Sequence, residues 1–153
     1  MLQKDYDNEV IELLARIPSE YAASQVSCDE VFEEAIKHFP VALGGIDWTR
    51  TKMLTSVSTT SLESPDEILG LAAQFVSVVG RCDRVYLVSD DYYSIGLECS
   101  VNAIRNVLEA WLSIPHAIFA FSLDFKFVFH VSMVRSAYIG KSLGGGKGIE
   151  RGA

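Results

Sequence analysis

The last third of the chain constrains the fold most, because its apolar residues alternate with a period of two. Residues 116–121 and 125–133 are both dense in Phe, Val and Ile, and Ser122-Leu123-Asp124 joins them. In the second segment one face comprises Phe125, Phe127, Phe129, Val131 and Met133, and the other comprises Lys126, Val128, His130 and Ser132. Such alternation predicts a β-hairpin with one face packed on helices and one face wetter. A short edge strand over residues 137–140 is expected to follow.

Four other segments have the apolar spacing of amphipathic helices, at residues 7–17, 28–39, 65–79 and 101–113. Asp7 is the expected cap of the first helix, and Ser27 with Glu30 predicts a capping box at the start of the second. The third is apolar nearly all round, which is typical of a helix buried on most sides. We therefore expect it at the centre of a helical layer.

Further strands are expected at residues 84–89 and 93–99, with one or two weaker strands within 46–57. Hairpins thus cluster and no regular βαβ alternation occurs. The pattern predicts a single α+β domain over residues 1–141, in which an antiparallel or mixed sheet packs one face against about four helices. Residues 142–153 are rich in glycine and are expected to form a flexible tail.

Charge favours a basic partner over a nucleic acid. The chain of 153 residues has a net charge of −7, and residues 1–39 alone hold nine acids and three bases. An acidic surface repels phosphate backbones and attracts cationic proteins. Three cysteines without a CxxC motif argue against a disulfide framework and a zinc site. The first residues lack the apolar core of a signal peptide and the apolar run 68–79 is too short to span a bilayer, so we expect a cytoplasmic protein.

Motifs for catalysis are missing from the sequence. It contains no GxGxxG, GxxxxGK[ST], GxSxG or HExxH pattern, so no cofactor, no metal and no enzymatic activity are expected. One alternative stays open: His116 and His130 could approach each other across the C-terminal hairpin and act as acid and base in a small enzyme or a ligand-binding domain. A self-associating scaffold built on the Phe-rich sheet is a further alternative.

Short acidic and aromatic runs are the candidate contacts for a cationic partner. Paired acids and aromatic rings at a turn are typical of binding hot spots, although a solvated turn would explain them equally well. The candidates are the turn Asp90, Asp91, Tyr92 and Tyr93, the pair Asp47 and Trp48, and a second patch of Glu30, Glu33 and Glu34.

The region from residue 84 to 141 resembles immunity proteins that protect bacteria from polymorphic toxins, including those of contact-dependent growth inhibition systems. The resemblance is carried by VYLVSD at 85–90, Ile114-Pro115-His116, Phe119, Asp124 and Tyr138-Ile139-Gly140. It implies a cytoplasmic, stoichiometric inhibitor that binds a cognate toxin domain, often a basic nuclease, and blocks its active site or substrate surface. We further expect a monomer or weak dimer that binds neither nucleic acid nor membrane.

Overall fold

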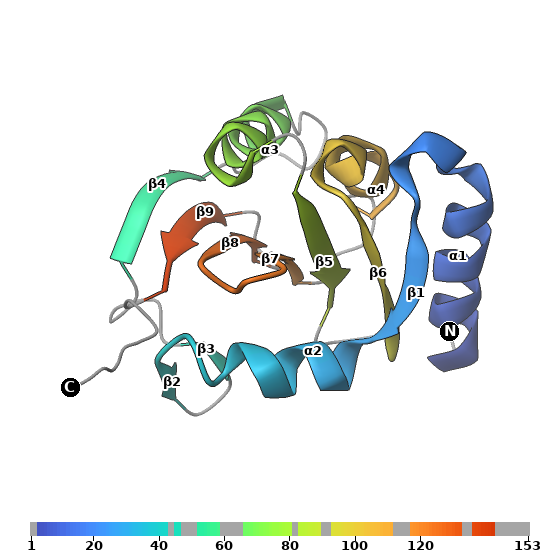
Figure 1. Cartoon of the computed structure of the whole chain (residues 1–153), viewed down its shortest axis with the longest axis horizontal. Helices are drawn as coiled ribbons and strands as arrows, with labels where there is room; N and C mark the ends of the chain where they lie inside the picture. The colour runs from blue at the N-terminus through green and yellow to red at the C-terminus, as the bar shows by residue number, and fades with distance from the viewer. Residues whose placement is uncertain are drawn as a thin grey trace.

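The structure is a computed structural model, and it describes residues 3–42, 45–46, 52–58, 66–80, 83–89, 93–111, 117–132 and 136–142. Within these residues seven strands form one sheet in the order β1-β6-β5-β7-β8-β9-β4, and every neighbouring pair is antiparallel (Figure 1). The strands are β1 (Ser24–Ser27), β4 (Lys52–Ser58), β5 (Arg84–Val88), β6 (Ile95–Ser100), β7 (Ile118–Ser122), β8 (Phe127–Val131) and β9 (Ser136–Lys141). Two short strands, β2 (Val41–Ala42) and β3 (Gly45–Ile46), pair separately. The α+β class expected from the sequence is confirmed.

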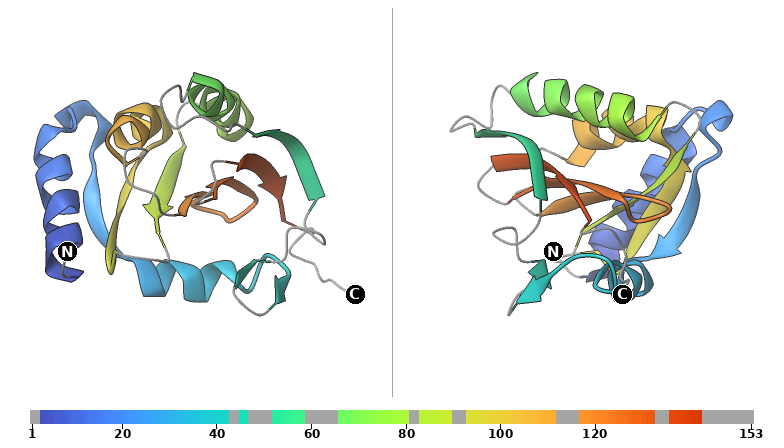
Figure 2. Two further views of the ribbon diagram at one scale, coloured as in Figure 1. Left: turned by 180° about the vertical axis from the view of Figure 1, so that it is seen from behind. Right: turned by 60° about the vertical axis from the view of Figure 1, so that its left-hand side comes forward.

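The helices lie on both sides of this sheet. They are α1 (Gln3–Arg16), α2 (Cys28–Ala35), α3 (Asp66–Val79) and α4 (Ile104–Trp111), with single 3₁₀ turns at Ser19–Tyr21 and Val101–Ala103. Figures 1 and 2 show α3 and α4 along one side of the strands, α2 along the opposite side, and α1 beside β1. No helix in the described part of the chain is long and apolar enough to cross a membrane.

Aromatic contacts confirm that both faces of the sheet are covered. The ring of Phe75 in α3 lies 5.8 Å from that of Phe129, and the ring of Phe32 in α2 lies 5.1 Å from that of Phe119. Phe119 and Phe129 point to opposite faces, because Phe129 pairs with Ala120 and side chains alternate along a strand. The prediction of helices on one face only is therefore wrong, since α2 covers the second face.

His130 lies on that second face and is buried. It pairs with Phe119 across the β7–β8 register, and the two rings stack with centroids 4.3 Å apart. Only 8% of His130 is exposed. The prediction that this residue faces a wetter surface is wrong, because the rings of Phe119 and Tyr138 stack on either side of its register and bury it.

In the hairpin between β7 and β8, the turn is longer than the alternation predicts and the second strand begins later. The carboxylate of Asp124 accepts hydrogen bonds from the backbone nitrogen of Lys126 at 3.0 Å and from the hydroxyl of Ser122 at 2.8 Å. This Asx-type turn keeps residues 123–126 out of the ladder, so β8 begins at Phe127. Phe125 takes a left-handed conformation in the turn, with φ of 57°.

One side-chain bond caps α2, and another joins α1 to the strand β6. The Ser27 hydroxyl accepts from the backbone nitrogen of Glu30 at 3.3 Å, which confirms the predicted cap of α2. Asp7 does not cap α1, because that helix begins at Gln3. Its carboxylate instead accepts from the backbone nitrogen of Ser94 at 2.9 Å, just before β6. The strand β1, which was not predicted from the sequence, leads directly into α2.

Candidate functional site

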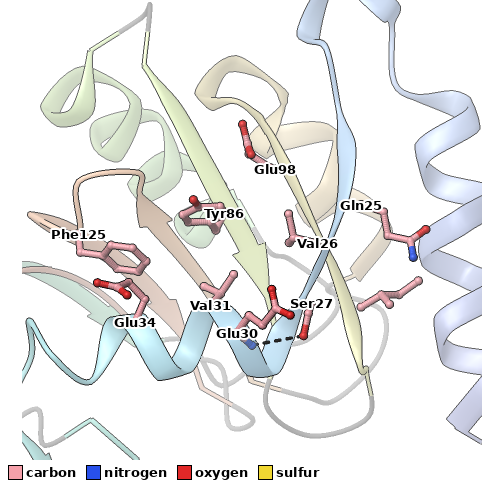
Figure 3. Close-up of a pocket in the computed structure, with 10 residues that line it drawn as sticks. Gln25, Val26, Ser27, Glu30, Val31, Glu34, Tyr86, Glu98 and Phe125 are labelled. Carbon is pink, nitrogen blue, oxygen red and sulfur yellow. Dashed lines mark hydrogen bonds between the residues drawn. The ribbon is translucent and has the colours of Figure 1, made fainter.

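A cleft of about 660 Å³ opens between α2 and the end of the sheet formed by β1, β6 and β5 (Figure 3). Three separate parts of the chain line it, comprising Gln25, Val26, Ser27, Glu30, Val31, Glu34, Tyr86, Ile95, Glu98 and Phe125. Among the described residues that line the cleft, three are carboxylates and none is a lysine, arginine or histidine. The cleft is therefore a concave site whose walls combine negative charge with aromatic surface.

Secondary structure aims the acidic side chains into the cleft. Glu30 and Glu34 are four residues apart on α2, so they lie on one side of the helix, one above the other. Glu98 pairs directly with Tyr86 across the β5–β6 register, so both side chains leave the same face of the sheet. In Figure 3 the ring of Tyr86 stands between Glu34 and Glu98.

An aromatic wall closes one end of the cleft. The ring of Phe125 stacks on Tyr86 with centroids 5.7 Å apart and on His38 with centroids 5.2 Å apart. Phe125 reaches this place because the turn holds its backbone at a positive φ. Bulky residues seldom adopt that conformation, and the strain costs about 1–3 kcal/mol that the surrounding packing must offset.

Cations beside the cleft hold two of the carboxylates. Arg84 donates from Nε to Oε2 of Glu98 at 2.8 Å and from Nη2 to the carbonyl of Ala22 at 2.7 Å. Lys37 donates to Glu34 at 3.1 Å, and Nε2 of His38 lies 3.4 Å from the same carboxylate. The hydrogen bond from Lys37, followed by that from His38, lowers the pKa of Glu34.

The negative charges of the cleft affect the pKa of the Tyr86 phenol. Burial raises its pKa, and the charges of Glu98 and Glu34 raise it further. Both effects disfavour a phenolate, so the hydroxyl stays protonated and can donate a hydrogen bond at neutral pH. The same carboxylates that disfavour a phenolate at Tyr86 would favour a positively charged group bound beside it.

The structure brings together part of the acidic patch predicted from the sequence. Glu30 and Glu34 both line the cleft, whereas Glu33, which lies between them along the chain, is exposed and does not line it. The predicted patch is thus divided by helix geometry into a concave part and an outer part.

Tyr93 lies in the protein interior, with only 4% of its surface exposed. Its ring stacks on Trp111 with centroids 5.1 Å apart, and its hydroxyl donates to Glu9 of α1 at 3.3 Å. Burial, followed by the charge of Glu9, raises its pKa. The expectation of an exposed Tyr93 anchor is wrong, because this ring packs between α1 and α4.

The other sequence-predicted contacts, Asp90, Asp91, Tyr92, Asp47 and Trp48, lie outside the described residues.

Sequence reasoning missed Tyr86, Glu98 and Phe125. Glu98 gave a signal, because it is the one charged residue of β6. That signal becomes useful only when the hairpin register is known, since the register places Glu98 opposite Tyr86.

The alternative pair of histidines is described only in part. Burial lowers the pKa of His130 to about 4, so its imidazole is neutral at pH 7. His130 does not line the cleft, and His116 lies outside the described residues. The enzyme hypothesis therefore stays a prediction. In the described ranges no three His, Cys, Asp or Glu side chains gather as a metal site, and burial raises the pKa of Cys99 to about 12.

Comparison with known proteins adds no assignment: no family model, no curated protein and no solved structure matches this chain.

Proposed function

We propose that this chain is a cytoplasmic immunity protein, which binds the basic nuclease domain of a cognate toxin and blocks its active site or substrate surface. In this role it performs no chemistry of its own. The observation that carries the proposal is the cleft, where Glu30, Glu34 and Glu98 surround Tyr86. Such a site suits a cationic protein surface better than it suits an anionic metabolite or a nucleic acid.

Most of the described acidic residues near the N-terminus extend the negative surface beyond the cleft. Along α1, α2 and the turn between α1 and β1, the exposed acids outside the cleft are Asp5, Glu12, Glu20, Asp29 and Glu33. A stable protein interface buries about 800 Å² on each partner, which is more than one cleft supplies. These acids therefore support a contact that has the cleft at its centre and α1 and α2 at its rim.

Inhibition would follow from the chemistry of the partner. A nuclease holds its substrate through positive side chains that contact phosphates. Carboxylates of the inhibitor can occupy the places of those phosphates, and the opposite net charges accelerate encounter. Affinity then requires no active-site group on the inhibitor, only shape and charge.

The proposal is tested with the gene immediately upstream of the one that encodes this chain. We expect it to encode a large secreted effector with a variable C-terminal toxin domain. That domain should co-purify with the chain in a one-to-one complex, and the chain should abolish its activity. Absence of binding and of protection would overturn the proposal.

A matched pair of charge reversals locates the surface. Glu30→Lys with Glu34→Lys should abolish protection because it places two cations in the cleft. Glu67→Lys with Glu109→Lys makes the same charge change on exposed positions of α3 and α4 and should leave protection intact. Asp90→Lys with Asp91→Lys tests separately whether the turn predicted from the sequence contributes.

A further inference from the structure

We infer that the cleft receives a single arginine side chain of the partner, whose guanidinium lies against Tyr86 between Glu34 and Glu98. The inference rests on the proposed function and specifies its central contact. The ligand class is a guanidinium cation on an extended aliphatic stem, presented by a basic protein surface.

The dimensions of the cleft fit an inserted side chain. Its volume of about 660 Å³ lies within the range of small-ligand sites, about 300–1,000 Å³. The apolar lining residues Val26, Val31 and Ile95 can contact the methylene groups of the stem, while the carboxylates and the phenol contact the polar head. Arginine side chains divide their burial in this way.

The aromatic surface favours guanidinium over ammonium. Tyr86 is half-buried and its ring stacks on Phe125, so the ring has a fixed orientation. A planar guanidinium is weakly hydrated and stacks on such rings, whereas an ammonium group is compact and strongly hydrated. The neighbouring carboxylates add charge-assisted hydrogen bonds in a fork that only the guanidinium can match.

The chain already uses a guanidinium at this end of the sheet. Arg84 bonds the carboxylate of Glu98 and the carbonyl of Ala22, which shows that this carboxylate accepts a guanidinium in a folded setting. A carboxylate has about four lone-pair sites, so Glu98 can accept from a second guanidinium.

The carboxylate of Glu34 is also accessible to an arginine side chain of the partner. Its present partners are Lys37, which is 66% exposed, and His38, which is 30% exposed, and Glu34 itself is 47% exposed. Ion pairs of this exposure contribute little to stability, so a partner arginine can displace Lys37 at small cost.

The test uses a small probe and does not depend on the toxin. N-acetyl-arginine methylamide is titrated into the ¹⁵N-labelled protein, with the citrulline and lysine analogues as comparison compounds. The arginine probe should shift the amide signals of β1, α2, Tyr86 and Glu98 in a saturable way, with a dissociation constant in the millimolar range. Citrulline has the same shape without the charge and should produce no saturable shift. Equal shifts for citrulline, or arginine shifts centred outside the cleft, would overturn the inference.

Variants separate the cleft from general acidity. Glu34→Gln should weaken the probe, whereas Glu33→Gln, one residue away and outside the cleft, should not. Tyr86→Leu should weaken it about tenfold through loss of the stacking surface, and Tyr86→Phe should retain most of the affinity. Thermal unfolding confirms that each variant is folded.

The same variants distinguish a failure of the inferred arginine contact from a failure of the proposed function. If the toxin domain binds the wild-type chain and neither Glu34→Gln nor Tyr86→Leu weakens that complex, the inference is overturned and the proposed function stands. If the toxin domain does not bind the chain at all, the proposed function falls, and the probe titration alone then decides whether the cleft receives a guanidinium.

Discussion

His130 shows how one buried residue couples the stability of this protein to pH. Its imidazole stacks on Phe119, and burial lowers its pKa from 6.5 to about 4. Between these two values the unfolded chain binds a proton that the folded chain excludes. The free energy of unfolding therefore falls as pH drops through this window, by up to about 3 kcal/mol from this residue alone.

Replacement of the imidazole should remove that contribution. His130→Phe retains a flat ring beside Phe119 and cannot be protonated. We expect the stability of the variant, relative to wild type, to improve as pH falls from about 6.5 to about 4, as measured by urea unfolding. Because the carboxylates titrate equally in both proteins, the difference isolates His130. Parallel stability curves over this range would contradict the assigned burial.

Phe125 is the second residue whose environment makes a sharp prediction. Its φ of 57° is unfavourable for any residue with a Cβ atom. Truncation removes the ring contacts, so both Phe125→Ala and Phe125→Gly should destabilise the fold, by about 3 kcal/mol for alanine. Glycine tolerates a positive φ, and we therefore expect the glycine variant to be the more stable by about 1 kcal/mol.

The control for Phe125 is Phe127, two residues later, which does not share the positive φ. There the order should reverse, because glycine in a strand loses more chain entropy than alanine. Chemical denaturation of the four variants measures both orders. Alanine proving the more stable at both positions would show that the turn is not strained.

At the scale of elements, the contact between β5 and β6 depends on Gly96. A Cβ atom at this position would come within 2.4 Å of the Leu87 carbonyl and 2.9 Å of Val88. Backbone atoms cannot yield as a side chain does. Gly96→Ala should therefore cost about 3 kcal/mol of unfolding free energy, and it should disturb the strand pair that carries Tyr86 and Glu98.

Gly70 provides the matched control within a helix. It lies exposed in α3, and a Cβ atom there would meet nothing within 4 Å. Gly70→Ala should raise the free energy of unfolding by about 0.5–1 kcal/mol, because alanine is the better helix former. Comparison of the two alanine variants by thermal unfolding checks both signs. A tolerated alanine at Gly96 would contradict the close β5–β6 approach.

The sequence predicted those elements that local chemistry determines. The third helix, expected at residues 65–79, is α3 at Asp66–Val79, and the Ser27 cap places the start of α2 correctly. Local hydrogen bonds and apolar periodicity suffice for such boundaries. β1 escaped prediction because its sequence, SQVS, is short and polar, and only pairing with β6 makes it a strand.

The site required information that no local pattern contains. Glu30 and Glu34 were predicted, with Glu33, from the acidic run of one helix, but Tyr86 and Glu98 meet only through strand register. Tyr93 was expected at the surface because α1, which covers it, is distant in sequence. Burial by a remote helix is a tertiary property, and it overrides the surface character of a turn.

At the scale of the whole molecule, the separation of roles between rim and cleft predicts how binding responds to salt. Glu12 and Glu33 are exposed outside the cleft, whereas Glu34 lines it. Under the proposed function, Glu12 and Glu33 would steer the partner at long range and Glu34 would contact it directly. The association rate constant with the toxin domain should fall about tenfold or more between about 50 and about 500 mM salt. The dissociation rate constant should change much less.

Variants that remove negative charge should then affect different rate constants, depending on where the charge lies. Glu12→Gln with Glu33→Gln should slow association and leave dissociation nearly unchanged, whereas Glu34→Gln should mainly accelerate dissociation because it removes a contact made only in the complex. Glu67→Gln with Glu109→Gln, on α3 and α4, should alter neither rate. Surface plasmon resonance over a salt series measures both constants. Two outcomes would show that the placement of the acids has no part in recognition. One is an association rate constant that does not change with salt, and the other is an equal effect of all three sets of variants on that constant.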